Sequence, residues 1–134
     1  MNLHGGDYNH YSDRVYRCKA CSGLRCFCES SKHREFTGAA ATGEAKEGAE
    51  YTAWDGYING KHLELVRARK IVDEWRTSEW PEGFAPSRLE FRFADKDGGT
   101  EVTMVHSEVP ESQAEAYRQG WVDYYWNPLK EYFD

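Results

Sequence analysis

The stretch LEFRFADKDGGTEVTMVHS, residues 89–107, decides the fold because it has the pattern of two antiparallel strands and the turn between them. Apolar and charged side chains alternate along its first part, as in a strand with one buried and one solvated face: Leu89, Phe91 and Phe93 against Glu90 and Arg92. Residues 97–99 (Asp-Gly-Gly) form the turn. In the second part, Val102, Met104 and His106 share one face. The pattern therefore predicts a half-buried β-hairpin.

Three more strands are predicted upstream of this hairpin: Glu50–Ile58, Lys61–Val66 and Lys70–Ser78. The Asn59-Gly60 pair between the first two predicts a tight hairpin turn. Residues 80–83 (Trp-Pro-Glu-Gly) have turn chemistry and end the third strand. With Leu89–Phe93 and Thr100–Ser107, the chain has five strands joined by short connections. We therefore expect a meander.

The segment Glu111–Phe133 predicts a closing helix that begins after Pro110, with an acidic first turn that suits the helix dipole. Apolar residues recur in it at three- and four-residue spacing: Ala114, Tyr117, Trp121, Tyr124 or Tyr125, and Leu129 or Pro128. Pro128 is expected to kink or loosen the last turns. Such a wide aromatic stripe needs a sheet to lie on, so the predicted fold class is α+β, with the sheet packed on one long C-terminal helix.

Composition bounds the function. At 134 residues, with 40% hydrophobic and 15% aromatic residues, the chain fits one soluble domain with a ring-rich core. Its net charge of -6 argues against nucleic-acid binding. No apolar run approaches the roughly 20 residues that a membrane span needs, and the N-terminus lacks the apolar core of a signal peptide. We expect a cytoplasmic protein with no membrane partner.

A series of short motifs from His33 onward follows the order and spacing of one known family: Phe36-Thr37-Gly38, Trp54-Asp55-Gly56-Tyr57-Ile58, Leu63-Glu64-Leu65-Val66, Trp75-Arg76, Trp80-Pro81-Glu82-Gly83, Asp97-Gly98-Gly99-Thr100, His106-Ser107, Gly120-Trp121 and Tyr124-Tyr125-Trp126. On these residues the chain resembles the activator of heat shock protein ATPase homologues (the Aha1-type C-terminal domain), in the START-like or SRPBCC superfamily. The resemblance implies a helix-grip fold, in which a curved antiparallel sheet wraps around the C-terminal helix and leaves a cavity. It also implies two possible partners, a small apolar ligand or a chaperone. We expect no cofactor.

The N-terminal segment departs from this family. Members begin with a strand and a short helix, and Tyr11–Glu29 resembles neither. We therefore divide the chain into an atypical segment, residues 1–30, and a START-like domain, residues 31–134, and expect the first strand and short helix to be absent or disrupted and the segment to be poorly ordered. Reading the codons one nucleotide later across Tyr16–Ser30 allows a family-like string, Ile-Asp-Ala-Lys-Pro-Ala-Pro-Val-Tyr-Asp-Ala. Our hypothesis is a frameshift in this segment.

The four cysteines all lie in this segment: Cys18, Cys21, Cys26 and Cys28. Four thiolates are enough for a tetrahedral zinc site. Their spacing is cramped for the usual pair of zinc knuckles. A frameshift product or an inert free-thiol tail is the alternative interpretation, and we expect no metal.

The candidate ligand-binding residues are aromatic or polar side chains expected near the cavity: Trp54, Tyr57, Trp75, Arg76, Phe91, His106, Trp121 and Tyr125. The rings can line a pocket or simply fill the core, and Arg76 or His106 can orient the polar end of a ligand. His106 can equally be a hydrogen-bonded core histidine. The sequence favours a non-catalytic domain that binds an apolar ligand or a protein partner. The alternatives are a cyclase- or hydratase-like enzyme that uses His106, and a non-functional frameshifted remnant.

Overall fold

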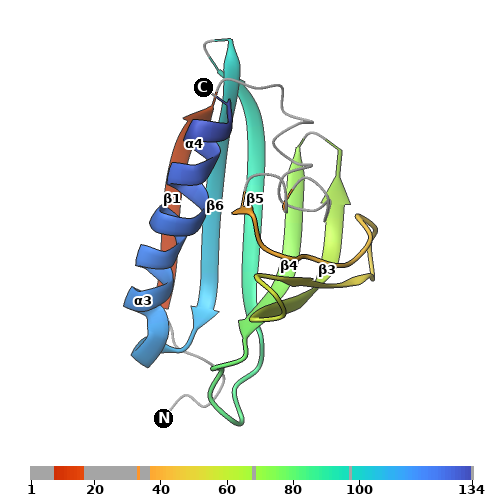
Figure 1. Ribbon diagram of the computed structural model, residues 1–134, viewed down its shortest axis with the longest axis vertical. Coiled ribbons are helices and arrows are strands. Elements are labelled where there is room, and N and C mark those ends of the chain that lie inside the picture. Colours follow the sequence, from red (N-terminus) through yellow and green to blue (C-terminus); the bar gives the residue numbers. More distant parts are fainter. Residues whose placement is uncertain (1–7, 17–32, 34–36, 68, 97, 134) are drawn as a thin grey trace.

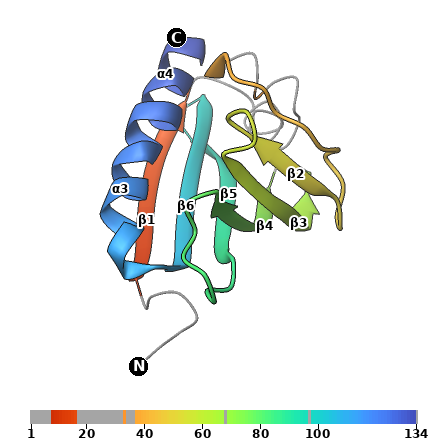
Figure 2. The same cartoon turned by 60° about the horizontal axis from the view of Figure 1, so that its bottom comes forward.

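A computed structural model describes residues 8–16, 33, 37–67, 69–96 and 98–133 of the chain. One six-stranded antiparallel sheet, in the order β1-β6-β5-β4-β3-β2, packs against the C-terminal helix (Figure 1). The strands are β1 (Tyr8–Tyr16), β2 (Glu50–Ala53), β3 (Ile58–Val66), β4 (Lys70–Thr77), β5 (Ser87–Lys96) and β6 (Gly99–Val109). The helix consists of α3 (Glu111–Trp121), the π-helical segment η1 (Val122–Trp126) and α4 (Asn127–Phe133). The sheet is strongly curved, and β2 and β3 run at a steep angle to β1 and β6 (Figure 2).

The predicted helix-grip fold is confirmed: β2 to β6 form a meander, and the long helix follows them. The predicted hairpin turn at Asn59-Gly60 is wrong. Both residues lie inside β3, opposite Thr52 and Tyr51 of β2. A Cβ at position 60 would lie 2.6 Å from the hydroxyl oxygen of Tyr51 and 2.0 Å from a backbone oxygen of β4. Glycine is therefore needed there for close approach of the neighbouring groups rather than for a turn.

The prediction that the first strand is absent or disrupted is also wrong for residues 8–16. They form β1, which pairs with β6 from Tyr8 opposite Val109 to Tyr16 opposite Thr100. Strand pairing uses backbone groups, and tyrosine and valine favour extended structure, so this edge is covered without the family's usual residues. The expected short helix and all four cysteines lie outside the described residues.

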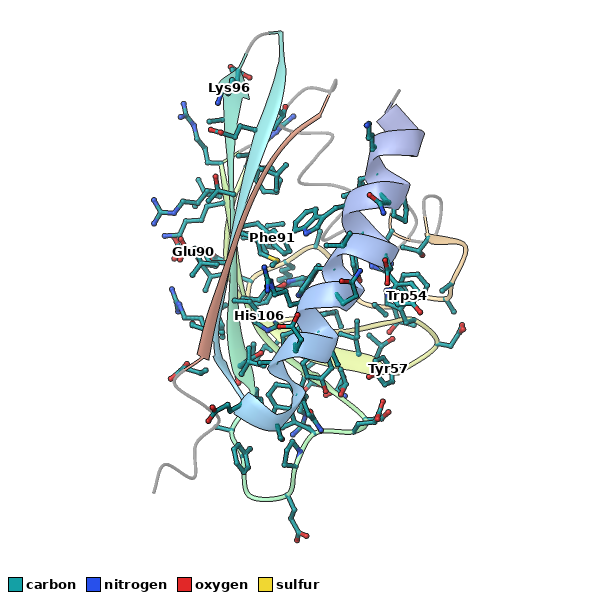
Figure 3. The ribbon with its side chains drawn as sticks, turned by 90° about the vertical axis from the view of Figure 1, so that its left-hand side faces the viewer. Trp54, Tyr57, Glu90, Phe91, Lys96 and His106 are labelled. Atoms are coloured by element: carbon teal, nitrogen blue, oxygen red, sulfur yellow. The ribbon has the colours of Figure 1, made fainter. Side chains whose placement is uncertain are left out.

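The core lies between the concave face of the sheet and the helix. Phe91 and His106 point from the sheet toward the helix, whereas Glu90 lies on the opposite face (Figure 3). The ring of Trp121 is 4% exposed and meets that of Phe91 edge-on, at a centroid distance of 5.8 Å. The predicted alternation of β5 is thereby confirmed, with Leu89, Phe91 and Phe93 all buried.

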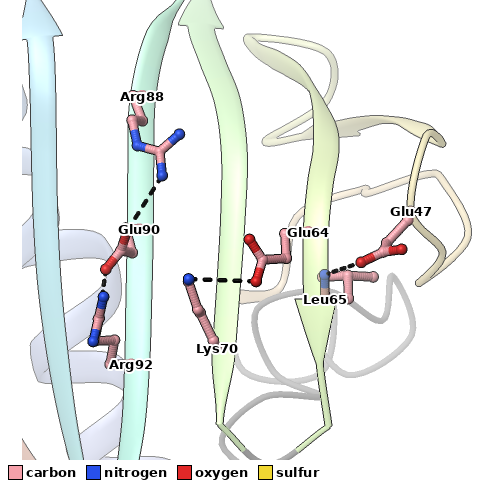
Figure 4. A network of polar contacts seen from close by, with 7 residues as sticks. All are labelled: Glu47, Glu64, Leu65, Lys70, Arg88, Glu90 and Arg92. Carbon is pink, nitrogen blue, oxygen red and sulfur yellow. Dashed lines mark hydrogen bonds and ion pairs between the residues drawn. The ribbon is translucent and has the colours of Figure 1, made fainter.

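The convex face of the sheet is polar. Lys70 pairs with Glu64, and Glu90 pairs with Arg88 and Arg92 (Figure 4). Most of these side chains are substantially exposed, and exposed pairs of this kind contribute little to stability. The face is therefore solvated, as the alternating sequence predicted.

The helix changes its winding where Pro128 was expected to kink it. Val122–Trp126 is π-helical, and the backbone N–H of Asn127 bonds to the carbonyl of Val122. Pro128 is the second residue of α4 and has no N–H to donate to the preceding turn, which is the π-helical segment. One consequence is that Trp121, Tyr125 and Trp126 are all buried on the sheet side of the helix.

Candidate functional site

A groove of about 370 Å³ runs between the helix and the turn that joins β2 to β3. Its walls are mainly aromatic and aliphatic: Trp54, Tyr57, Ile58, Trp75, Ala116, Tyr117, Gly120, Trp121, Tyr124 and Tyr125. Five of the eight predicted ligand-binding residues are in this set: Trp54, Tyr57, Trp75, Trp121 and Tyr125. The volume and the apolar lining are those of a site for a small apolar molecule.

The turn at the rim of the groove has an unusual backbone. Trp54, Asp55 and Gly56 have φ angles of 55°, 58° and 89°. The left-handed region is costly for a bulky residue such as tryptophan, so surrounding contacts must hold Trp54 in place. The Nε1–H of Trp54 donates to the Tyr125 hydroxyl over 2.9 Å, and the Asp55 carboxylate accepts the backbone N–H of Ala40 over 3.0 Å. The strain is therefore located at the site itself.

Tyr125 connects the helix to both the turn and the N-terminal part of the domain. Besides accepting from Trp54, its hydroxyl lies 2.7 Å from Nε2 of buried His33. Burial lowers the pKa of His33 to about 4, so the ring is neutral at pH 7. Burial also raises the pKa of Tyr125 well above its usual value. The Tyr125 hydroxyl and the His33 ring therefore form hydrogen bonds beside the groove, and neither side chain is charged at pH 7.

The lower rim of the groove is fixed by two further tyrosines. The hydroxyl of Tyr57 donates to Glu79 over 2.8 Å, and burial together with this bond raises the pKa of Tyr57 to about 12. The hydroxyl of Tyr117 donates to the side chain of Gln113 and also lies 2.6 Å from the Thr77 hydroxyl. The groove walls are therefore tied to β4 and to the first turns of α3 before any ligand arrives.

His106 does not line the groove. Its Nδ1 accepts the indole N–H of Trp121 over 3.2 Å, and its Nε2 lies 2.8 Å from the hydroxyl of Ser87. Because Ser87 donates its own proton to the carbonyl of Trp75, it accepts from Nε2–H. His106 is 1% exposed and is a hydrogen-bonded core histidine, one of the two interpretations left open by the sequence.

Arg76 and Phe91 also lie outside the groove. Arg76 is exposed and donates from Nε to the Asn59 side chain over 2.8 Å, because it follows inward-facing Trp75 and the strand alternates its faces. It therefore does not join the groove residues as a polar anchor. Phe91 lies deeper, against Trp121, and lines a second, smaller hollow.

This inner chamber, of about 30 Å³, lies beneath the groove and shares four lining residues with it: Ile58, Trp75, Trp121 and Tyr125. It contains a polar pair that sequence reasoning missed, His62 of β3 and Asp73 of β4, directly opposite each other in the sheet. Nδ1 of His62 is 2.7 Å from Oδ1 of Asp73, and the two residues are 1% and 3% exposed. Burial raises the pKa of Asp73, partly offset by the hydrogen bond from His62.

The described residues include no cluster of three or more His, Cys, Asp or Glu side chains that would hold a metal ion. The alternative zinc ligands Cys18, Cys21, Cys26 and Cys28 lie outside that part of the chain. Within it, no helix combines the length and the apolar character needed to cross a bilayer.

Comparison with known proteins points to one family. The family model described as Activator of Hsp90 ATPase homolog 1-like protein matches residues 25–134. The human activator of 90 kDa heat shock protein ATPase homolog 1 is 39% identical over 110 residues, which cover 81% of this chain and 32% of the human protein. The Dictyostelium discoideum homologue is 29% identical over 107 residues, which cover 79% of this chain and 28% of that protein. The chain thus spans about a third of the length of the curated relatives it matches.

Solved structures agree on the fold. A crystal structure of an HSP90 activator from Plasmodium falciparum superposes with a TM-score of 0.86 at 19% identity, over 92% of this chain and 94% of that one. The solution structure of the Aha1 dimer from Colwellia psychrerythraea gives 0.79 at 14% identity, over 94% and 96% of the two chains. Together with the match over residues 25–134, these findings show that the chain belongs to the family of Activator of Hsp90 ATPase homolog 1-like proteins.

Proposed function

We propose that this chain is a non-catalytic START-like domain that binds a small apolar ligand in the groove between the helix and the β2–β3 turn. The observation that carries the proposal is the groove itself, about 370 Å³ in volume and lined mainly by rings. Sites for small molecules are concave, largely apolar and mostly preformed. The strained turn at Trp54 and the hydrogen bonds of Tyr125 support preformation here.

The hydrogen bonding of His106 favours binding over a cyclase- or hydratase-like reaction. Both of its ring nitrogens are engaged, with Ser87 and with Trp121, and it does not border the groove. A general acid or base must come within hydrogen-bond reach of the substrate atom that it serves. His106 would have to break its own network to do so.

The proposal is tested with naphthalene, a neutral apolar probe that fits a groove of this size. Three tryptophans line the groove, so binding is expected to change the intrinsic fluorescence. Ala116 is exposed at the groove wall, and Ala116→Phe is expected to fill the groove and abolish binding while the melting temperature changes little. Glu115→Phe is the matched control, because Glu115 does not line the groove. Equal binding by the wild type and Ala116→Phe would exclude the groove as the site.

A second candidate function is contact with a chaperone of the 90 kDa heat shock family. The observation that favours it is the name of the relatives, since the human protein and its mouse counterpart are both named as activators of the ATPase of that chaperone. Such a role would place the protein in the cytoplasm. Because the chain spans a third of those relatives, binding is expected without full activation.

The chaperone function is tested by titrating the purified chain into a 90 kDa heat shock protein and measuring both binding and ATP turnover. Ala116→Phe and Glu115→Phe then show whether the groove takes part in the contact. If neither binding nor a change in turnover is seen at high micromolar concentration, the chaperone candidate is wrong, and naphthalene binding still decides the first proposal.

A further inference from the structure

The inner chamber contains a polar atom that the fold itself leaves unused. Nε2 of His62 is buried and has no hydrogen-bond partner among the described residues, although Nδ1 is bound to Asp73. Burying a polar nitrogen without a partner is unfavourable, so native structures rarely retain such a group without a reason. His62 and Asp73 both line the chamber.

The chamber is too small for a ring but large enough for one small polar group. Its volume of about 30 Å³ exceeds the roughly 10–15 Å³ that a single water-sized group requires. It shares Ile58, Trp75, Trp121 and Tyr125 with the groove above it. A ligand whose rings contact these shared side chains is therefore the molecule best placed to reach His62 with a substituent.

We propose that the His62–Asp73 pair anchors the hydroxyl group of an aromatic alcohol or phenol whose ring occupies the groove. This inference rests on the proposed function of the groove and adds the class of ligand. A hydroxyl can donate to a bare Nε2 or accept from Nε2–H, so it can pair with either tautomer of His62. Asp73 fixes the ring by holding Nδ1.

The charges around the chamber argue against an acidic ligand. The chamber lining includes no lysine or arginine, and the carboxylate of Asp73 lies beside the ring of His62. A buried ligand carboxylate would lie near the carboxyl group of Asp73 with no lysine or arginine in the lining to pair with it, which is costly in a low-dielectric interior. A neutral hydroxyl avoids this cost.

The experiment compares 2-naphthol with naphthalene, which differ by one hydroxyl group. Without an anchor, the more water-soluble 2-naphthol is expected to bind no more tightly than naphthalene. With the anchor, the wild type is expected to bind 2-naphthol about five- to tenfold more tightly, the gain of one buried hydrogen bond. In the same titrations, 2-naphthol but not naphthalene is expected to shift the ¹⁵N resonance of His62 Nε2.

The variants remove the pair without leaving one partner buried alone. The double variant His62→Phe/Asp73→Leu replaces both polar side chains and is expected to abolish the preference for 2-naphthol while naphthalene still binds. Lys61→Ala, at the neighbouring exposed position of β3, is the control that keeps the preference. The wild-type resonance shift provides a readout that does not depend on the variants folding.

Three outcomes would overturn the inference. Equal binding of the two probes by the wild type would show that the chamber takes only water, and a preference that persists in the double variant would show that the hydroxyl binds elsewhere. In both cases the proposed function of the groove stands. If neither probe binds the wild type, the proposed function fails and this inference fails with it.

Discussion

Replacing Tyr125 by phenylalanine is the sharpest test of how the groove is held. The change removes one oxygen atom that takes part in two hydrogen bonds, with Trp54 at 2.9 Å and with His33 at 2.7 Å. The ring itself stays, so its tilted contact with Trp121, at a centroid distance of 4.6 Å, is retained. Any loss of stability in Tyr125→Phe therefore reports on the hydroxyl.

The size of the effect follows from the burial of the two partners. His33 is 6% exposed, so losing its bond leaves a desolvated nitrogen and costs about 1–3 kcal/mol. Trp54 is only partly buried and can turn to water, so its share is about 0.5–1.5 kcal/mol. The free energy of unfolding is thus expected to fall by about 1.5–4.5 kcal/mol. In urea, with an m-value near 2 kcal/mol/M, the midpoint should fall by about 1–2 M.

Tyr124→Phe is the matched control, since it makes the same chemical change at the next residue. Tyr124 is 55% exposed, and surface changes of this kind usually stay within about 0.5 kcal/mol. Equilibrium urea unfolding of the three proteins, followed by tryptophan fluorescence, gives the comparison. If Tyr125→Phe unfolds at the wild-type midpoint, or if Tyr124→Phe loses as much, the hydroxyl of Tyr125 does not hold the turn.

Three further experiments test other parts of the molecule and of its sequence. The pKa of His33 is about 4 in the folded state against 6.5 in the unfolded chain, so between these pH values the unfolded state binds more protons. The free energy of unfolding should therefore stay constant above pH 7 and fall by about 3 kcal/mol toward pH 4. In His33→Gln, the urea midpoint should depend less on pH over this range. Gly120→Ala should raise the free energy of unfolding by about 0.5–1 kcal/mol, because alanine favours the helix and the added Cβ meets nothing closer than Tyr124 Cδ2 at 3.9 Å. The melting temperature should rise accordingly. A lower melting temperature would mean that the helix needs the glycine. Sequencing the coding DNA across Tyr16–Ser30 tests the frameshift hypothesis, which is wrong if no single-base shift yields the family-like string.

Local patterns predicted the elements well because they act over a few residues. The alternation of Leu89, Phe91 and Phe93 needs only the two-residue period of a strand, and the aromatic stripe of the helix needs only its own spacing. The same alternation, applied to β4, would have separated outward-facing Arg76 from inward-facing Trp75.

The features that could not be predicted from the sequence depend on contacts between residues far apart in the chain. Asn59-Gly60 has hairpin chemistry, but Tyr51 lies across Gly60 and needs the space, which only the folded sheet reveals. His62 and Asp73 are eleven residues apart and become a pair only through the register of β3 on β4. The pairing of residues 8–16 with β6 is likewise a property of the sheet edge.

The π-helical segment Val122–Trp126 holds one residue more than a turn of regular α-helix does. Ahead of it, Ala114 and Trp121 are buried seven residues apart, and beyond it Leu129 is buried eight residues after Trp121. Deleting a single residue from this segment would shorten the interval from Trp121 to Leu129 to seven residues and restore regular winding, so the two side chains would stay in phase. Leu129 and Trp121 would both stay against the sheet, so the extra residue affects which rings of the segment itself are buried, Tyr125 and Trp126 among them, and not the phase of the helix ends.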